Sequence, residues 1–326
     1  MAMTRPTPLL RRWLAALALL LPLIASAQEL PTRTLTLVVG FAPGGAADTA
    51  ARLVARKLQD NLGQTVVVDN RAGAGGNIAH QLVARAEPDG ATILLGSVGP
   101  LAIAPHLGKL GYDPQKDLAP LTMGMSFPNV LVVHAGVGAK TLAQYVAIAK
   151  KSPGKLDYAS TGAGSASHLA GELLDQVAGI ETVHVPYKGG APALADLLAG
   201  RVAAYFSTWS TAQPHVESGK LIPLASTGLT RPAFLPNIPT VAESGYPGFN
   251  ATNWYAFVAP AKVPPPLLER WNRELVKVLN TPEVRDELVK HGLTPNPGSR
   301  EALAATIDAE SRAWGKLIRE RKIVGQ

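Results

Sequence analysis

The sequence predicts an α/β protein of two lobes, built from short buried strands that alternate with amphipathic helices. Continuous runs of Val, Leu and Ile, rather than alternating apolar and polar residues, are typical of strands that helices cover on both faces. The first run, 35–40 (LTLVVG), precedes a helical pattern that places on one face Ala50, Leu53, Val54 and Leu58. This succession indicates parallel strands joined by right-handed crossovers.

The remaining elements repeat this pattern, and the series starts again in the middle of the chain. We expect further strands at 65–70, 91–97, 129–135, 156–160, 182–187, 203–207, 221–227 and 254–261. We expect further helices near 76–86, 140–151, 165–178, 190–199, 265–280, 282–291 and 300–321. A proline-rich loop over 231–248 precedes the last strand.

The chain is expected to cross between the lobes at two strands, near 129–135 and 255–260. The C-terminal helices then return to the first lobe, which makes that lobe discontinuous. We therefore predict a first lobe of 28–131 plus 252–326 and a second lobe of 132–251. Two connecting segments are typical of a hinge. One large α/β domain stays an alternative, because length alone does not exclude it.

Residues 1–27 have the three-part layout of a cleavable signal peptide. A basic leader with Arg5, Arg11 and Arg12 precedes the apolar run Trp13–Ile24, and Ala25-Ser26-Ala27 supplies a small-residue cleavage site before Gln28. The apolar run is shorter than the ~20 residues of a membrane-spanning helix. We expect the chain to be exported, with an uncleaved anchor as the alternative.

Charge and cysteine content exclude several classes of function. Cleavage after residue 27 lowers the formal net charge from +7 to +4. The basic residues are scattered, whereas nucleic-acid binding needs a concentrated basic face, so we expect no nucleic-acid partner. The absence of cysteine excludes disulfides, thiolate nucleophiles and thiolate metal ligands. The charge supports only a weak preference for small anions.

Four glycine-rich junctions, each between a predicted strand and a predicted helix, carry the main functional signal. They span 41–48, 70–80, 159–168 and 186–196. Glycine lets a ligand approach the main chain closely, and the first N–H groups of a helix favour an anion. Ligands of open α/β sheets bind at the carboxyl ends of the strands. We predict an anion site shared by the junctions, with ordinary tight turns as the alternative.

Other chemistries fit the junctions less well. Ile78 stands where a dinucleotide fingerprint needs its last glycine, and no junction has the Gly-Lys-Ser/Thr of a P-loop. The Gly96-Ser97 pair does not match a nucleophile elbow. Ser165 and His168 lie three residues apart at a helix start and could touch. An exported serine hydrolase that uses Ser165 or Ser97 is the alternative function.

No histidine spacing matches a metal site, and we expect no cofactor and no metal. Two side chains of the first junction allow two interpretations each. Asp48 lies in the first turn of a helix, where the helix dipole favours a carboxylate. It could also orient the loop or accept a hydrogen bond from a ligand. Phe41 is either a wall of the pocket or a core residue.

Nine segments distributed along the chain carry a family resemblance. They are VVGFAPGGAADTAARLVARKL, VVVDNRAGAGGNIA, PDGATILLGSVGPLAIAPHL, YDPQKDLAPLT, YASTGAGSASHLAGELL, VHVPYKGGAPALADLLAGRV, GKLIPLAST, RPAFLPNIPTVAESGYPGF and VAPAKVPPPLLERWNRELVKVL. Together they resemble the Bug-type receptors, the substrate-binding receptors of tripartite tricarboxylate transporters. The resemblance covers nearly the whole chain after residue 27, and it is specific to the family but not to a ligand.

The resemblance implies a type II periplasmic binding-protein fold whose two lobes close, like a Venus flytrap, on one small carboxylate without catalysis. It implies contacts from backbone amides, small hydroxyl groups and ordered water at the helix starts. Matched by motif, the contact residues would be Gly44, Gly45, Ala46, Asp48, Ala74, Gly75, Ser97, Ser160, Thr161 and Ser165.

The resemblance also implies partners and a place of action. The receptor would be a periplasmic monomer that delivers its carboxylate to inner-membrane transporter subunits or to a sensor. We further expect the junction 41–48 to meet the junction 159–168 across the cleft, so that each lobe supplies one side of the ligand site.

The chain departs from the family pattern at Ala203 and Ser207, where the family usually has acidic residues. Ser207 is predicted to lie near the ligand. The loss of a carboxylate there would remove repulsion of an acidic ligand, or the partner of an ammonium group. An amino-acid ligand is therefore less expected than a simple mono- or dicarboxylate.

Overall fold

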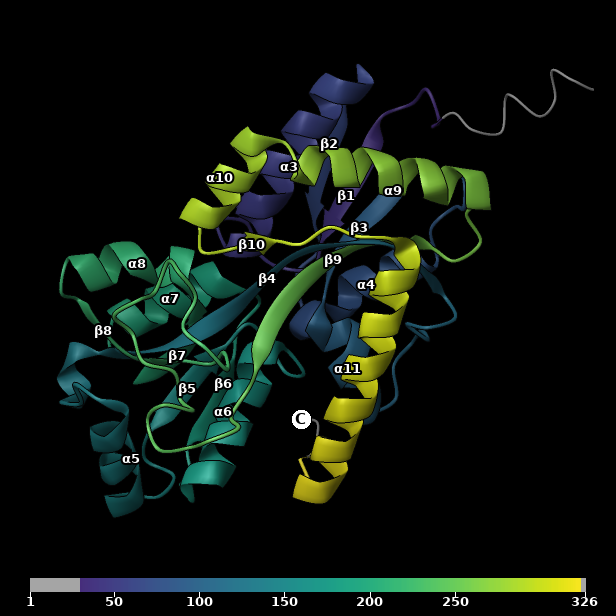
Figure 1. Cartoon of the computed structure of the whole chain (residues 1–326). Helices are drawn as coiled ribbons and strands as arrows, with labels where there is room; N and C mark the ends of the chain where they lie inside the picture. Colours follow the sequence, from purple (N-terminus) through teal and green to yellow (C-terminus); the bar gives the residue numbers. More distant parts are fainter. Residues whose placement is uncertain (1–29, 324–326) are drawn as a thin grey trace, which may run out of the picture.

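The computed structural model describes residues 30–323, and the predicted signal peptide lies outside them. One ten-stranded sheet runs through the molecule (Figure 1). Its strands are β1 (Leu35–Val39), β2 (Val66–Asn70), β3 (Thr92–Ser97), β4 (Leu118–His134), β5 (Asp157–Ser160), β6 (Val183–Pro186), β7 (Ala204–Thr208), β8 (Leu221–Ser226), β9 (Thr252–Pro260) and β10 (Thr294–Pro295).

Helices cover the sheet on both faces. They are α3 (Ala46–Leu62), α4 (Asn77–Ala84), α5 (Leu142–Lys151), α6 (Ala166–Ala178), α7 (Gly190–Leu198), α8 (Trp209–Glu217), α9 (Pro265–Leu279), α10 (Pro282–Lys290) and α11 (Arg300–Arg321). Short helical turns lie at η2 (Ala74–Gly76), η3 (Gly99–Ile103), η4 (Ala104–His106) and η5 (Ala135–Val137). No helix of residues 30–323 is long and apolar enough to cross a membrane.

The sheet has a parallel group of strands at each end. Its main path is β2-β1-β3-β9-β4-β7-β5-β6. β1 pairs in parallel with β2 and β3, and β5 pairs in parallel with β6 and β7. We call β1–β3 with α3, α4, α9, α10 and α11 the first lobe, and β5–β8 with α5–α8 the second lobe. The α/β prediction is confirmed.

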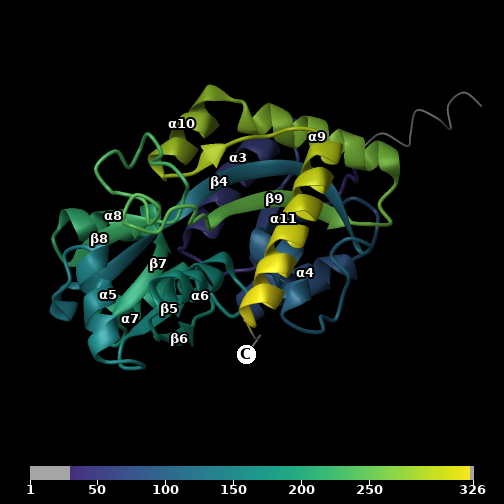
Figure 2. The ribbon, with the colours of Figure 1, turned by 60° about the horizontal axis from the view of Figure 1, so that its bottom comes forward.

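The central strands β4 and β9 join the two groups and are antiparallel to their neighbours. Residues 118–128 of β4 pair with β9, and residues 129–134 pair with β7 and β8. Figure 2 shows the two strands side by side between the lobes. The sequence predicted only the second half of β4. Pro120, Gly124 and Pro128 interrupt the apolar pattern of its first half, and the register shifts twice there.

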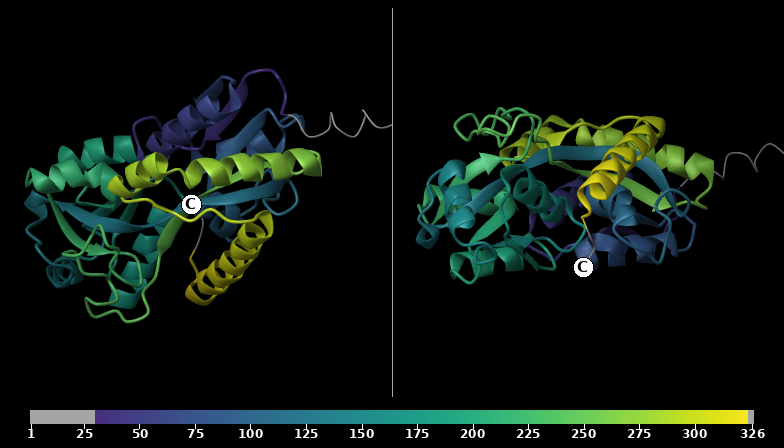
Figure 3. Two further views of the ribbon diagram at one scale, coloured as in Figure 1. Left: turned by 45° about the horizontal axis from the view of Figure 1, so that its top comes forward. Right: turned by 90° about the horizontal axis from the view of Figure 1, so that it is seen from below.

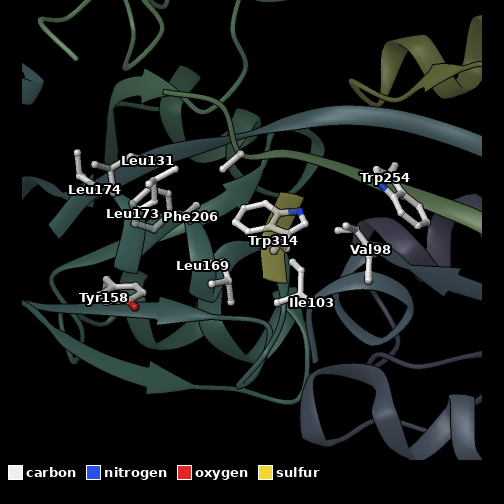
Figure 4. Close-up of a cluster of buried hydrophobic side chains, with 14 of the residues drawn as sticks. Val98, Ile103, Leu131, Tyr158, Leu169, Leu173, Leu174, Phe206, Trp254 and Trp314 are labelled. Atoms are coloured by element: carbon white, nitrogen blue, oxygen red, sulfur yellow. The ribbon is translucent and has the colours of Figure 1, made fainter. Parts of the chain in front are cut away.

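One apolar core extends through both lobes, and α11 contributes to it. Trp314 of α11 is 6% exposed and belongs to the same buried cluster as residues of β4, α4 and α6. Figure 4 shows its ring between Leu169 and Phe206 of the second lobe and Ile103 of the first lobe. Figure 3 gives two further views of α9, α10 and α11 beside the first-lobe strands. The C-terminal helix thus packs against both lobes.

The helix α8 and the helical turns η3 and η4 are among the segments that were not predicted. Pro214 lies inside α8, where its missing N–H and its ring disfavour a helix interior. The turns η3 and η4 contain Pro100 and Pro105 near their starts, where proline is tolerated. The helix α8 directly follows β7, and the turns η3 and η4 closely follow β3.

Candidate functional site

The four glycine-rich junctions meet between the lobes, and their direct backbone contacts run in two pairs. The Ala42 amide donates a hydrogen bond of 2.9 Å to the Lys188 carbonyl. A Cβ on Gly45 would lie 3.6 Å from the Gly190 nitrogen. The junction 41–48 therefore faces residues 188–190. As predicted, the junction 41–48 also faces 159–168 across a cavity, which Phe41 lines together with Thr161 and Ser165.

The junction 70–80 makes the direct backbone contacts with 159–168. Gly75 has φ +62°, and a Cβ on it would lie 2.3 Å from the Ala163 carbonyl oxygen. A Cβ on Gly162 would lie 2.6 Å from the Gly75 nitrogen, and one on Gly99 would lie 2.7 Å from the Gly164 oxygen. Real Cβ atoms do not approach other atoms this closely. Glycine at these positions therefore lets the backbones of the two lobes touch.

A small cavity of about 20 Å³ remains between the lobes, which is room for about one water molecule. Its lining residues come from both lobes and from both central strands: Phe41, Ser97, Asn129, Thr161, Ser165, Ala166, Ser167, Tyr205, Phe206, Thr208, Asn253 and Tyr255. None of them is Asp, Glu, His, Lys or Arg. Burial raises the pKa of Tyr205 and of Tyr255, so both phenols stay neutral.

Larger hollows, with volumes of about 360 to 520 Å³, lie elsewhere on the molecule. One lies between Leu101, Lys109 and Ser311, and another between α6 and α11. None of the four is lined by residues of the glycine-rich junctions. The small cavity is the one at the carboxyl ends of the parallel strands, where α/β sheets bind ligands.

Two helices of the second lobe begin at the cavity. Ser165 is the N-cap of α6, and Thr208 is the N-cap of α8. Both residues line the cavity, as do Ala166 and Ser167 of the first turn of α6. The first N–H groups of a helix lack partners within it, and the helix dipole places a partial positive charge there. This part of the wall therefore favours an anion without a cationic side chain.

Hydroxyl groups fix the loop that leads into α6. The Ser165 hydroxyl donates a hydrogen bond of 2.6 Å to the Gly162 carbonyl and accepts one from the His168 amide. The Ser167 hydroxyl accepts a bond of 2.9 Å from the Thr161 amide and lies 3.0 Å from the Ser165 hydroxyl. These bonds are local and uncharged, and they leave the backbone of the loop in one conformation.

Ser160 lies behind this loop and does not line the cavity. It is fully buried, and its hydroxyl lies 2.5 Å from Nε2 of His184 and accepts from the Gly162 amide. The ring of His184 stacks on that of His168, with centroids 4.0 Å apart. His168 accepts from the Gly164 amide through Nδ1, and its Nε2 lies 3.5 Å from Glu172.

This arrangement gives Ser165 no general base. The His168 ring is engaged with Gly164 and Glu172, and only its backbone amide bonds to the Ser165 hydroxyl. The hydrogen bond from His168 outweighs burial and, with that from Tyr158, lowers the pKa of Glu172. The polar groups behind the loop therefore form a structural network.

Asp48 braces the first junction. It is 5% exposed and accepts hydrogen bonds of 3.0 Å from the Gly44 amide, Nε of Arg52 and Nδ2 of Asn70. Burial by itself would raise the pKa of Asp48, but the bonds from Arg52, Gly44 and Asn70 outweigh it and hold the pKa below its usual value. Asn70 also donates to the Phe41 carbonyl. Asp48 thus orients the loop from behind the cavity wall.

The structure brings some of the predicted site residues together at the cavity. Phe41, Ser97, Thr161 and Ser165 line it. The Phe41 ring is 7% exposed, lies 6.4 Å from the Tyr255 ring and belongs to the core as well. Ligand contact by these four residues stays a prediction.

The other predicted residues do not line the cavity. Gly44 has φ +82°, Gly45 is the N-cap of α3 and Ala46 is its first residue. Ala74 has φ +48° in the turn before α4. Ser207 is fully buried, and its hydroxyl donates to the Thr208 carbonyl. With Gly75, Asp48 and Ser160, they shape the loops around the cavity, and a direct role for them in ligand binding is untested.

Several lining residues were not anticipated. Asn129 lies on β4, Asn253 and Tyr255 on β9, and Tyr205 and Thr208 at β7. None belongs to a glycine-rich junction, and no local motif marks them. Only their position on or next to the strands that cross between the lobes could have indicated them. Within residues 30–323, no cluster of His, Cys, Asp and Glu could hold a metal ion.

Known proteins resemble this chain along most of its length. Residues 50–323 match the model of the tripartite tricarboxylate transporter family receptor. The solved structure of the periplasmic binding protein BugD is 34% identical, with a TM-score of 0.86 over 91% of this chain and 100% of that one.

Two further solved structures contain ligands. Rpa4515 of R. palustris, solved with adipate, is 35% identical, with a TM-score of 0.87 over 91% of this chain and 99% of that one. MatC (Rpa3494) of Rhodopseudomonas palustris, solved with bound malate, is 31% identical, with a TM-score of 0.84 over 88% of this chain and 99% of that one. Both ligands are small carboxylates.

Proposed function

Since this chain belongs to the tripartite tricarboxylate transporter receptor family, a family of solute-binding proteins and not of enzymes, we propose that it captures a small carboxylate between its two lobes. The adipate of Rpa4515 and the malate of MatC support this ligand class. The alternative of a serine hydrolase is set aside, because the family is not catalytic.

One observation carries the proposal: an interlobe cavity without an ionic side chain, at which two helices begin. Ser165 and Thr208 stand at the N-cap positions of these helices, and no Lys or Arg lines the wall. A carboxylate there would be held by main-chain N–H groups and hydroxyls, and no buried cation would have to be desolvated. A ligand of several heavy atoms needs more space than about 20 Å³, so the lobes must separate further to admit it.

The predicted residues divide into three roles in this proposal. Phe41, Ser97, Thr161 and Ser165 contact the ligand from the cavity wall. Gly44, Gly45, Ala46, Ala74 and Gly75 set how closely the lobes approach, and Asp48, Ser160 and Ser207 hold the surrounding loops. Support comes from the backbone contacts between lobes and from the hydrogen bonds behind the wall.

We also propose the place and partners of the receptor. The signal peptide 1–27 would direct it to the periplasm, where homologues such as BugD act as binding proteins. As a monomer of two lobes, 28–131 plus 252–326 and 132–251, it would deliver its ligand to inner-membrane subunits. The change of β4 pairing from β9 to β7 between Pro128 and Asn129 supports a boundary there. N-terminal sequencing of the exported protein should begin at Gln28.

A thermal-shift screen tests the function. The exported chain is heated with mono-, di- and tricarboxylates, aromatic acids and neutral amides, each with and without EDTA. Binding raises the melting temperature by mass action, so at least one small carboxylate should do so, and EDTA should leave the shift unchanged. Stabilisation by neutral amides alone, or by no compound, would contradict the proposal.

A further inference from the structure

Asn129 stands at the point where β4 passes from one lobe to the other, and its backbone is fully engaged. Its amide donates a hydrogen bond of 2.9 Å to the Thr227 hydroxyl, and its carbonyl accepts one of 2.9 Å from the Thr227 amide. The residue is 1% exposed and lines the interlobe cavity. Its side-chain Nδ2 is buried without a hydrogen-bond partner among residues 30–323. The fold therefore fixes the residue but does not use its side-chain amide.

Asn253 occupies the corresponding place on β9, the other strand between the lobes. It pairs with Phe127 of β4 and also lines the cavity. Its Oδ1 is buried and likewise has no partner among the described residues. Buried polar atoms in proteins are nearly always hydrogen-bonded, because leaving them unpaired opposes folding. Two residues with such atoms line one small cavity, and this indicates that a ligand supplies the partners of these atoms.

The chemistry of the pair limits what that partner can be. A side-chain amide offers donors through its nitrogen and an acceptor through its oxygen, and it carries no charge. In the side-chain orientations of this structure, a second ionised carboxylate could accept from Nδ2 of Asn129 but could not donate to Oδ1 of Asn253. It would also be buried without a cation, which is unfavourable. A ligand ammonium would lack a carboxylate partner, since the lining has no Asp or Glu.

We propose that Asn129 and Asn253 recognise an uncharged group of the ligand that both donates and accepts hydrogen bonds, a hydroxyl or a carboxamide. The ligand is then a small monocarboxylate with such a group at its other end. This inference rests on the proposed function, because the helix starts of the second lobe hold the carboxylate. The central strands β4 and β9 contact the other end of the same ligand through these two side chains.

The first experiment compares four ligands of nearly one shape by calorimetry with the exported chain: succinamate, succinate, 4-hydroxybutyrate and butyrate, together with the analogues one carbon shorter. At least one of the polar ligands, which are succinamate, 4-hydroxybutyrate and their analogues one carbon shorter, should be preferred. It should bind at least about tenfold more tightly than the dicarboxylate and the alkyl acid of the same chain length. Equal or tighter binding of the dicarboxylate would overturn the inference.

Two variants assign the preference to the pair. Asn129→Leu and Asn253→Leu keep the number and branching of the side-chain heavy atoms and remove the hydrogen bonds, so each should reduce the preference for the polar ligand over butyrate about tenfold, while butyrate still binds. Thr252→Val is the matched control on β9, because Thr252 lines the hollow beside Trp314 instead. It should leave the preference unchanged. An unchanged preference in both Leu variants would overturn the inference.

A third variant guards against loss of folding. Asn253→Asp places a carboxylate opposite the end group of the ligand, so it should bind 4-aminobutyrate more tightly than the wild type does and succinamate more weakly. Failure to gain 4-aminobutyrate binding, in a variant that still binds butyrate, would overturn the inference. If no carboxylate of the panel binds the wild type, the proposed function itself fails; if carboxylates bind without discrimination, only the role of the asparagines fails.

Discussion

The two lobes present glycine-rich junctions to the same cavity but hold them in different ways. In the first lobe the carboxylate of Asp48, with Arg52 and Asn70, braces the loop from behind the wall. In the second lobe the hydroxyls of Ser165 and Ser167 do the same work without charge. Both solutions keep ionic groups out of the cavity lining. An amide-based anion site requires this, because a buried carboxylate beside the ligand would repel it.

The lobes also contribute different things to the site. The first lobe offers Gly75 and Gly99, whose bare backbone touches the second lobe. The second lobe offers the N-termini of α6 and α8. Changes in the first lobe should therefore act on how closely the lobes approach. Changes at the second-lobe helix starts should act on how the carboxylate is held.

Among the substitutions that test this difference between the lobes, Gly75→Val should have the largest effect on ligand affinity. A Cβ there would lie 2.3 Å from the Ala163 carbonyl, so the lobes could not close, and we expect the dissociation constant to rise at least about 1000-fold, or roughly 4 kcal/mol. Gly63→Val is the matched control. Gly63 has φ +65°, close to the +62° of Gly75, but nothing lies within 4 Å of its Cβ position. Calorimetry that finds the same loss of affinity in both variants would contradict the account.

His80 should make the first lobe sensitive to acid. Burial lowers its pKa to about 4, although the bond to the Gly76 carbonyl opposes this. The neutral ring is favoured in the fold, so its contribution to stability is complete above about pH 6.5 and is lost as the pH falls towards 4, by up to about 3 kcal/mol. The free energy of unfolding, measured with urea, should therefore decrease less steeply from pH 7.5 to pH 4.5 in His80→Gln than in the wild type. Equal pH dependence in variant and wild type would refute this role.

Asp175 should give the second lobe the opposite dependence. Burial raises the pKa of Asp175 to about 6, and the nearby carboxylates of Glu172 and Glu181 add to this rise. Two hydrogen bonds from Thr182 oppose it. The protonated form is favoured in the fold, so stability is lost as the pH rises from about 4 to 6. We expect Asp175→Asn to stabilise the protein by about 2 kcal/mol at pH 7.5 and by little at pH 4. A destabilised variant at pH 7.5 would be contrary to this expectation.

Ser165→Ala should have the smallest effect on stability. It should nevertheless distinguish a cap at the cavity from a cap elsewhere in the fold. Loss of the N-cap of α6 costs about 1 kcal/mol of unfolding free energy. Ser299 caps α11 in the first lobe and accepts from the Ala302 amide, so Ser299→Ala should cost about the same. Only Ser165→Ala should also weaken carboxylate binding, by about tenfold. Equal affinities in the two variants would exclude Ser165 from the site.

Local patterns predicted the separate elements well and their long-range contacts poorly. The helix expected at 265–280 is α9 (Pro265–Leu279), and that expected at 165–178 is α6 (Ala166–Ala178). Apolar periodicity is a local property, so it identifies such segments. It carries no signal for which junction faces which. The direct backbone contacts of the junction 41–48 with residues 188–190 were therefore not predicted.

The same difference between local patterns and long-range contacts applies to the residues of the candidate site. Ser165 was recognisable because it lies in a glycine-rich junction at a predicted helix start, and Asp48 because it lies in the first turn of a predicted helix. Asn129 and Asn253 lie in strands of ordinary appearance, and only the folded arrangement of β4 and β9 brings both of them to the lining of one cavity. Their unpaired amide atoms exist only in the folded molecule. Sequence alone could not have selected them.

The central claim is that main-chain amides and helix starts, without a cation or a metal, hold a carboxylate between the lobes. Calorimetry of the exported chain with small acids and their neutral amides, such as butyrate with butyramide and propionate with propionamide, tests it most directly. The account predicts that an acid binds, that its amide binds at least about 100-fold more weakly, and that EDTA changes neither result. Equal binding of acid and amide, or binding that EDTA abolishes, would contradict it.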